Sequence, residues 1–163
     1  MKIFLIDDNQ VLVDALCLAL SRLANITVVG SAKPGDSGIE YLLRAGDPDI
    51  VTVDVGAVAD ELMPFAATVV GAAPRAKLMA LTGRQDRELA VRAATAGFDG
   101  WVSKTSLMET FTTAMFAVRH DGAWFPPAQV TAIIQQFRAN AKTSIDGSAH
   151  GFDKNGIPCR AYS

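Results

Sequence analysis

The first 120 residues alternate five times between a short apolar run and a longer segment with helical periodicity. The runs are mostly apolar and too short to be helices, so we predict strands at 2–6, 26–29, 50–54, 77–81 and 100–103. Between them, apolar residues recur every three or four positions, which predicts helices at 12–23, 39–46, 59–71, 88–96 and 107–118. The leucines at 12, 16, 20 and 23 are one such stripe, and we expect them in the core.

This alternation predicts an α/β fold, in which a doubly wound five-stranded parallel sheet carries helices on both faces. The third run is apolar on both faces because it contains Ile50, Val51 and Val53. This is typical of a strand in a sheet with helices on both faces. Folds of this kind bind ligands at the carboxyl ends of their strands. The residues that directly follow each strand are therefore the candidates for function.

Composition narrows the class of protein. The 163 residues suffice for one domain with a short appendage. Fifteen basic residues against 17 acidic ones give a charge of -2, and no basic run is present, so we do not expect nucleic-acid binding. The apolar stretches are too short for a membrane span, and Met1-Lys2 leads straight into a strand, so we expect a soluble, cytoplasmic protein. Cys17 and Cys159 form neither a disulfide framework nor a metal-ligand pattern.

Polar residues follow four of the five expected strands. Asp7 and Asp8 follow the first, Asp54 closes the third, Thr82 follows the fourth and Lys104 follows the fifth. Because the carboxyl ends of parallel strands share one edge, we expect these side chains to meet. Three neighbouring carboxylates repel one another unless a cation or proton lies among them, so the set predicts a Mg²⁺ site. A lysine and a hydroxyl beside such a metal suit phosphoryl transfer, with Asp54 as the nucleophile.

Taken singly, these residues have simpler interpretations. Asp8 or Asn9 would serve as a helix cap, Thr82 as a turn hydroxyl and Trp101 as ordinary core. The conjunction of the right residue types at four strand ends favours a site.

Together these residues resemble the receiver domain of two-component response regulators, over roughly residues 1–120. The resemblance implies the flavodoxin-like strand order 2-1-3-4-5, which places the first and third strands side by side. It also implies a Mg²⁺ site in which Asp8 binds the metal directly and Asp7 through water. Asp54 and the backbone carbonyl of Gly56 would complete that site.

The same resemblance assigns the remaining roles. Asp54 would accept the phosphoryl group, and Thr82 and Lys104 would hold its oxygens. Trp101 looks like the aromatic switch residue of the family. On phosphorylation the Thr82 hydroxyl would move toward Asp54, and the indole of Trp101 would turn inward from solvent.

The chain departs from the usual receiver pattern near these residues. Ala57 and Val58 stand where the family usually has Met-Pro, and Asn9-Gln10 stands where His-Pro is common. Thr105 replaces a frequent proline after the lysine, and the switch position carries Trp instead of Tyr or Phe. None of these differences removes a catalytic group.

The segment 122–127 and the helix expected after it resemble the NarL/LuxR-type branch, whose members continue into a DNA-binding helix-turn-helix domain. Because only 23 residues follow Asn140, we expect that output domain to be missing. The expected division is a receiver domain at 1–121, a linker and amphipathic helix at 122–140, and a polar tail at 141–163. The amphipathic helix should fold back on the domain or bind a partner through an apolar stripe. That stripe consists of Val130, Ile133, Ile134 and Phe137.

The expected function is a signalling switch that accepts a phosphoryl group on Asp54 from a histidine kinase or phosphotransfer protein. We expect it to catalyse no reaction other than its own phosphorylation from a phosphodonor and its own dephosphorylation. Its output would reach a protein partner or a second copy through the face of the fourth helix, fifth strand and fifth helix. Two alternatives stay open: an interaction module that is never phosphorylated, and a truncated DNA-binding response regulator. An FMN protein is disfavoured because Asp7 and Asp8 would repel its phosphate.

Overall fold

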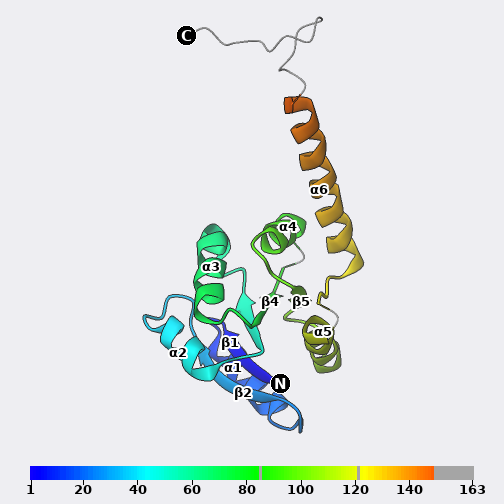
Figure 1. The fold of residues 1–163 in the computed structure, drawn as a ribbon. Helices are drawn as coiled ribbons and strands as arrows, with labels where there is room; N and C mark the ends of the chain where they lie inside the picture. Colours follow the sequence, from blue (N-terminus) through cyan, green and yellow to red (C-terminus); the bar gives the residue numbers. More distant parts are fainter. Residues whose placement is uncertain (85, 121, 149–163) are drawn as a thin grey trace, which may run out of the picture.

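The computed structural model describes residues 1–84, 86–120 and 122–148. In that part of the chain, five parallel strands form one sheet in the order β2-β1-β3-β4-β5 (Figure 1). The strands are β1 (Lys2–Ile6), β2 (Thr27–Ala32), β3 (Ile50–Asp54), β4 (Lys77–Thr82) and β5 (Gly100–Ser103). The predicted fold class and strand order are confirmed.

Six α-helices and one short 3₁₀ helix (Ala59–Glu61) accompany the sheet in the described residues. The α-helices are α1 (Gln10–Leu20), α2 (Ile39–Gly46), α3 (Leu62–Ala72), α4 (Arg87–Thr95), α5 (Met108–His120) and α6 (Pro127–Ser148). Asp121, the predicted end of the receiver domain, lies outside the described residues, as do Cys159 and most of the predicted tail.

Two hydrophobic clusters cover the two faces of the sheet. Phe4 and Ile6 of β1 pack on one face with residues of α2, α3 and α4. Ile3 and Leu5 of the same strand pack on the other face with residues of α1 and α5. This alternation follows from the two-residue period of a strand. All five residues of β3 are buried, as predicted for a strand covered on both faces.

Some boundaries differ from the predictions. Leu23 lies beyond the end of α1 and is 38% exposed, so its assignment to the core was wrong. Leu107 precedes α5 and is exposed instead of lining that helix. Strand β2 continues past Val29 because Gly30 and the two residues after it keep pairing with β1. A side chain at Gly30 would meet the ring of Phe4, since a Cβ there would lie 2.6 Å from Cε2.

Helix α6 runs to Ser148, past the predicted end of the amphipathic helix and into the expected polar tail. No Gly or Pro occurs between Pro127 and Gly147, so the sequence offers no residue that would break the helix earlier. The helix packs against α4 and extends away from the sheet (Figure 1). No helix in the described ranges is both long and apolar enough to cross a membrane.

The segment between α5 and α6 closes one edge of the sheet. Trp124 forms an isolated parallel bridge with Gly100 of β5. Its carbonyl accepts from the Trp101 N–H at 2.8 Å, and its own N–H donates to the Asp99 carbonyl at 2.9 Å. Strand β5 is therefore hydrogen-bonded on both sides, by β4 and by this linker.

Candidate functional site

Asp7 and Asp54 lie side by side at the carboxyl ends of two neighbouring strands. Ile6 of β1 is in register with Val53 of β3, so the next residue on each strand is one of these two aspartates. Both are buried, with 4% of Asp7 and 8% of Asp54 exposed. The strand order brings together two carboxylates that are far apart in the sequence.

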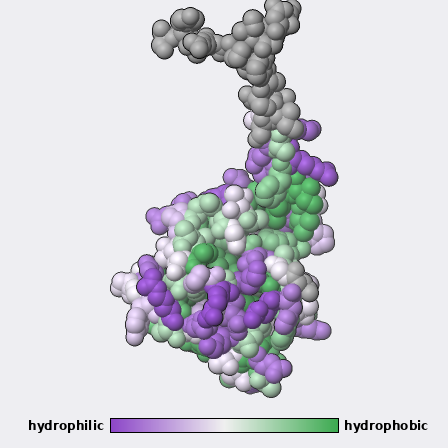
Figure 2. Space-filling model, viewed as in Figure 1, coloured by the Kyte–Doolittle hydropathy of each residue, from purple (hydrophilic) through white to green (hydrophobic). Residues whose placement is uncertain are grey.

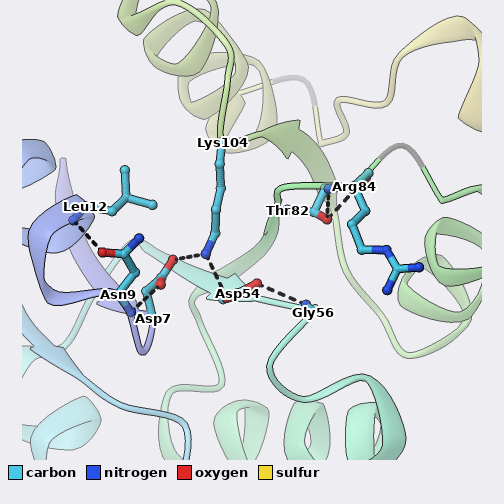
Figure 3. A network of polar contacts seen from close by, with 8 residues as sticks. All are labelled: Asp7, Asn9, Leu12, Asp54, Gly56, Thr82, Arg84 and Lys104. Carbon is cyan, nitrogen blue, oxygen red and sulfur yellow. Dashed lines mark hydrogen bonds and ion pairs between the residues drawn. The ribbon is translucent and has the colours of Figure 1, made fainter.

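Backbone N–H groups hold both carboxylates in place. Oδ1 of Asp7 accepts from the N–H of Asn9 at 2.9 Å, and Oδ1 of Asp54 accepts from the N–H of Gly56 at 3.0 Å (Figure 3). A Cβ at Gly56 would lie 3.3 Å from this Asp54 oxygen, which leaves a larger side chain little room. The role of the Gly56 carbonyl as a metal ligand stays a prediction.

Asp8 completes an acidic cluster with these two residues. One carboxylate oxygen from each of Asp7, Asp8 and Asp54 lies within 4.8 Å of the others. Asp8 is exposed, and the cap of α1 is made by Asn9, whose Oδ1 accepts from the N–H of Leu12 at 3.2 Å. The simpler interpretation of Asp8 as that cap is therefore wrong, while that of Asn9 is confirmed. A group of carboxylate oxygens with one exposed member fits a hard divalent cation such as Mg²⁺.

The ammonium group of Lys104 bridges the two buried carboxylates. Its Nζ lies 2.7 Å from Oδ2 of Asp7 and 2.7 Å from Oδ2 of Asp54 (Figure 3). Burial alone would lower the pKa of Lys104, but the hydrogen bonds and negative charges of Asp54 and Asp7 raise it above its usual value. Lys104 is thus a cation at neutral pH. Three carboxylates face one ammonium, so the cluster keeps a net negative charge that favours a further cation.

Thr82 is fully buried at the end of β4, but its hydroxyl is bonded elsewhere. It accepts from the N–H of Arg84 at 3.0 Å and donates to the carbonyl of Arg84 at 3.2 Å. Figure 3 shows this turn apart from the contact between Lys104 and Asp54. The Thr82 carbonyl, however, accepts from the N–H of Lys104 at 2.7 Å. Thr82 therefore supports Lys104 through its main chain, a role that its side-chain chemistry did not suggest.

Trp101 is already buried, with 1% of its surface exposed. The expectation that its indole turns inward from solvent is therefore wrong for this structure, because β5 places the ring in the cluster beneath α3 and α4. Its Nε1 has no hydrogen-bond partner among the described residues. A buried indole N–H normally finds an acceptor, so this donor is an unusual feature of the core.

The simpler interpretation of Thr82 as a turn hydroxyl is confirmed, because its hydroxyl is bonded to the backbone of Arg84. One contributor to the site escaped prediction, namely the Gly56 N–H that binds Asp54. It had no signal of its own in the sequence, since any residue except proline carries that N–H.

Comparison with known proteins agrees with this geometry. Residues 3–116 match the family of response regulator receiver domains. A transcriptional regulatory protein of Bacillus subtilis, YxjL, named as uncharacterized, is 26% identical over 154 residues, covering 94% of this chain and 70% of its own.

Solved structures share the fold. A LuxR-family two-component response regulator from Aurantimonas has a TM-score of 0.69 at 23% identity, covering 83% of this chain and 96% of its own. A response regulator from Burkholderia pseudomallei, solved with a phosphorylated aspartic acid and a calcium ion, has a TM-score of 0.61 at 24% identity. That match covers 74% of this chain and 69% of the other. Because the family match spans more than half of the sequence, the chain belongs to the response regulator receiver domain family.

Proposed function

We propose that the chain is a phosphorylation-dependent signalling switch, with Asp54 as the phosphoacceptor. The observation that carries the proposal is the position of Lys104, whose Nζ lies 2.7 Å from both Asp7 and Asp54. A fixed ammonium beside a buried carboxylate is suited to neutralise the charge of a phosphoryl group attached there. The Burkholderia pseudomallei relative, whose structure contains a phosphorylated aspartic acid, supports this chemistry.

Asp7, Asp8 and Asp54, with the Gly56 carbonyl, are the residues that we propose hold Mg²⁺. Three carboxylate oxygens within 4.8 Å of one another are the hard oxygen donors that this ion prefers. The bound ion would supply positive charge to the phosphoryl oxygens. Since Asp8 is exposed and the other two are buried, the ion would enter from the side of Asp8.

The reaction itself needs few protein groups. One carboxylate oxygen of Asp54 would attack the phosphorus atom of the donor and form the O–P bond of an acyl phosphate. The donor's leaving group would depart with the electron pair of the broken bond. Lys104 would stay beside Asp54 and face the new phosphoryl oxygens, while the Gly56 N–H holds the other carboxylate oxygen in place.

The turn at Thr82 would report the modification. To donate to a phosphoryl oxygen, the Thr82 hydroxyl must release the Arg84 backbone, which it now contacts. Because the Thr82 carbonyl also binds the N–H of Lys104, a moving turn would affect β5 as well. We propose that residues 82–84 have two arrangements and that phosphorylation favours the one in which the hydroxyl faces Asp54.

Intact mass after incubation with acetyl phosphate and Mg²⁺ tests the proposal. The wild type should gain one phosphate, and Asp54→Asn should gain none. Asp60→Asn is the matched control, because Asp60 is an exposed aspartate outside the cluster. It should be phosphorylated like the wild type, and chelation of Mg²⁺ should abolish the adduct in both. A phosphate that still attaches to Asp54→Asn would contradict the assignment.

An interaction module that is never phosphorylated is the second candidate, favoured by one observation. Both Lys104 and the Thr82 hydroxyl already have protein partners, which an interaction module would keep permanently. In that case neither a phosphate adduct nor stabilisation by Mg²⁺ should appear in the wild type. Both measurements use the same protein sample and decide between the candidates.

For partners, we propose a histidine kinase or phosphotransfer protein as donor. We propose that the output passes through the face of α4, β5 and α5 to a protein or a second copy. Part of that face is already in use, since α6 packs on α4 and Trp124 pairs with β5. Specific DNA binding is not expected from a chain of charge -2. Sequence-selective, salt-sensitive retardation of a duplex would contradict this and would favour a DNA-binding regulator. The Bacillus subtilis relative is named a transcriptional regulatory protein.

A further inference from the structure

Four loops at the carboxyl edge of the sheet are built in the same way. At or directly after the end of β1, β3, β4 and β5, a side-chain oxygen accepts from the main-chain N–H two residues further along. Such a turn restricts the backbone of the residue that it spans. In three of these turns the accepting residue belongs to the candidate site, while the fourth spans Lys104. The accepting residues are Asp7, Asp54, Thr82 and Ser103, and the donors are Asn9, Gly56, Arg84 and Thr105.

Ser103 holds the turn around Lys104 through three contacts. Its Oγ accepts from the N–H of Thr105 at 3.2 Å and lies 2.8 Å from the Thr105 hydroxyl, so the two hydroxyls share a hydrogen bond. Its main-chain carbonyl accepts from the N–H of Ser106 at 3.0 Å, which closes a β-turn. Lys104 is the second residue of that turn. The two residues that follow Lys104 are thus both bonded back to Ser103.

The turn is also fixed against the neighbouring strand. Ser103 is in register with Thr82 of β4, and the Thr82 carbonyl accepts from the N–H of Lys104 at 2.7 Å. The main chain on both sides of Lys104 is therefore held by contacts that do not involve its ammonium group.

The side chain of Lys104 has to meet two acceptors at once. Its Nζ lies 2.7 Å from Oδ2 of Asp7 and 2.7 Å from Oδ2 of Asp54. Lysine is among the side chains that lose the most rotamer freedom when they are held in one place. The direction in which the side chain leaves the backbone decides whether its ammonium reaches both carboxylates. A backbone that is already fixed at residue 104 makes this arrangement easier to reach and to keep.

We propose that Ser103 is a positioning residue, whose hydroxyl directs Lys104 toward Asp7 and Asp54. The donor to this hydroxyl is the N–H of Thr105, at the position where receiver domains frequently have proline. A proline carries no N–H, so this turn depends on a departure of the chain from the usual pattern. The effect of Ser103 on phosphorylation rests on the function proposed for Asp54, whereas its effect on the place of Lys104 does not.

Ser103→Ala tests the proposal, because it removes both side-chain contacts and leaves the carbonyl that bonds Ser106. With acetyl phosphate and Mg²⁺, the initial rate of phosphate incorporation, followed by intact mass, should fall by about tenfold. Ser103→Thr keeps a hydroxyl at the same place and should restore the rate of the wild type. Stabilisation by Mg²⁺ should persist in both variants, because the three carboxylates of the acidic cluster remain.

Two further variants separate this effect from a general loss of stability. Ser106→Ala removes a neighbouring hydroxyl and keeps the N–H that closes the turn. Thr143→Ala removes a hydroxyl bond to the Ala139 carbonyl, near the end of α6. Figure 2 shows α6 extending away from the domain, with apolar surface along it. Both variants should be phosphorylated at the rate of the wild type.

The place of the Lys104 ammonium can also be measured without phosphorylation. Proton–nitrogen NMR of isotope-labelled protein detects lysine ammonium groups whose protons are shielded from exchange with water. Lys104, assigned through its absence from Lys104→Met, should give such a signal in the wild type and in Ser103→Thr, and should lose it in Ser103→Ala. Lys77, whose Nζ lies 2.9 Å from Asp99, begins β4 at the opposite end of the sheet and is the internal reference. Its signal should be the same in all of these proteins.

Three results would overturn the proposal. The first is a Lys104 signal that is the same in the wild type and in Ser103→Ala, whether it is present in both or absent from both. The second is a loss that Ser103→Thr does not restore, which would assign the effect to something other than the hydroxyl. The third is a wild type that is phosphorylated, but no faster than Ser103→Ala. A wild type that gains no phosphate at all contradicts the function proposed for Asp54, and the ammonium signal then decides on Ser103 by itself.

Discussion

The main-chain N–H of Trp101 donates to the carbonyl of Trp124 at 2.8 Å, so the linker is bonded to the strand that leads into Lys104. Strand β5 has four residues, and Lys104 follows it directly. The contact between Lys104 and Asp54 and the base of α6 are therefore joined by one short strand.

The indole N–H of Trp101, which has no hydrogen-bond partner in the part of the chain that the structure describes, leads to a prediction about stability. Trp101→Phe removes a buried donor and keeps most of the ring, so the free energy of unfolding should change by no more than about 1 kcal/mol. Trp101→Ala empties the site and should lower that free energy by about 3–5 kcal/mol. Urea denaturation of the three proteins measures both values. If Trp101→Phe and Trp101→Ala lowered the free energy of unfolding equally, the interpretation of Trp101 as a core residue with a dispensable N–H would be contradicted.

Gly100 is predicted to be intolerant of a side chain. A Cβ there would lie 2.7 Å from Cγ2 of Val118 and 3.1 Å from Cγ of Met79, inside the core. Gly100→Ala should therefore lower the free energy of unfolding by about 1–3 kcal/mol through overpacking. In the double variant with Val118→Ala, the clash is relieved, so the loss should be smaller than the sum of the two single losses. Strict additivity in urea denaturation would argue against the clash.

Asp8 should matter for metal binding and little for folding. Mg²⁺ that binds only the folded protein raises its melting temperature, and this increase should be present in the wild type. Asp8→Asn should abolish or greatly reduce it, while the melting temperature without Mg²⁺ stays nearly unchanged because Asp8 is exposed. Differential scanning fluorimetry with and without Mg²⁺ is the measurement, with Asp60→Asn as control. An undiminished response in Asp8→Asn would remove Asp8 from the metal site.

The raised pKa of Lys104 predicts a loss of stability at alkaline pH. Burial opposes the charge on Lys104, but Asp54 and Asp7 outweigh it, so the folded-state pKa lies above the ordinary value of 10.5. The stabilisation is complete below that value and decreases as pH rises through the folded-state pKa. The free energy of unfolding of Lys104→Met, subtracted from that of the wild type, should thus be constant from about pH 8 to about pH 10 and smaller above it. Urea titrations at each pH give this difference, and a decrease that begins near neutral pH would contradict it.

The Thr82 hydroxyl should be required for the switch and dispensable for metal binding. In a Trp124→Phe background, Trp101 emission should change when Mg²⁺ and beryllofluoride are added. The expected change is a modest spectral shift, because the ring is already buried. Thr82→Ser should preserve this response and Thr82→Ala should weaken it, while Mg²⁺ still stabilises both. A full response in Thr82→Ala would exclude the hydroxyl from the switch.

The positions of Asp7, Asp54 and Lys104 could be predicted because a parallel sheet collects its strand ends on one edge, whatever the loops do. For the Thr82 hydroxyl the sequence offered two interpretations, a local turn and a contact with a phosphoryl group, and could not decide between them. A buried hydroxyl bonds the nearest suitable groups, and the Arg84 backbone two residues away competes with any distant partner. Trp101 likewise had two interpretations, core residue and switch residue, which the sequence could not separate because both share the same aromatic character; the structure places it in the core.

The position of α6 shows a second limit of prediction from the sequence. Its apolar periodicity predicted both the helix and its apolar stripe, and the structure contains both. The same pattern suggested that the stripe would face either the domain or a partner. In the structure, Gln135 and Gln136 of α6 line the groove beside α4. Amphipathicity identifies the side that seeks apolar contact, and it does not say whether that contact lies within the chain or outside it.

The linker at Trp124 also bears on where this chain can be divided. The family match ends at residue 116, yet the carbonyl that seals the outer edge of β5 belongs to residue 124. A protein cut at the family boundary would keep every residue of the candidate site and expose an unpaired strand edge, which is a template for adding a strand from another molecule. Such a fragment should aggregate more readily than the longer chain. The segment that contains the candidate site is thus shorter than the segment that folds without an exposed strand edge.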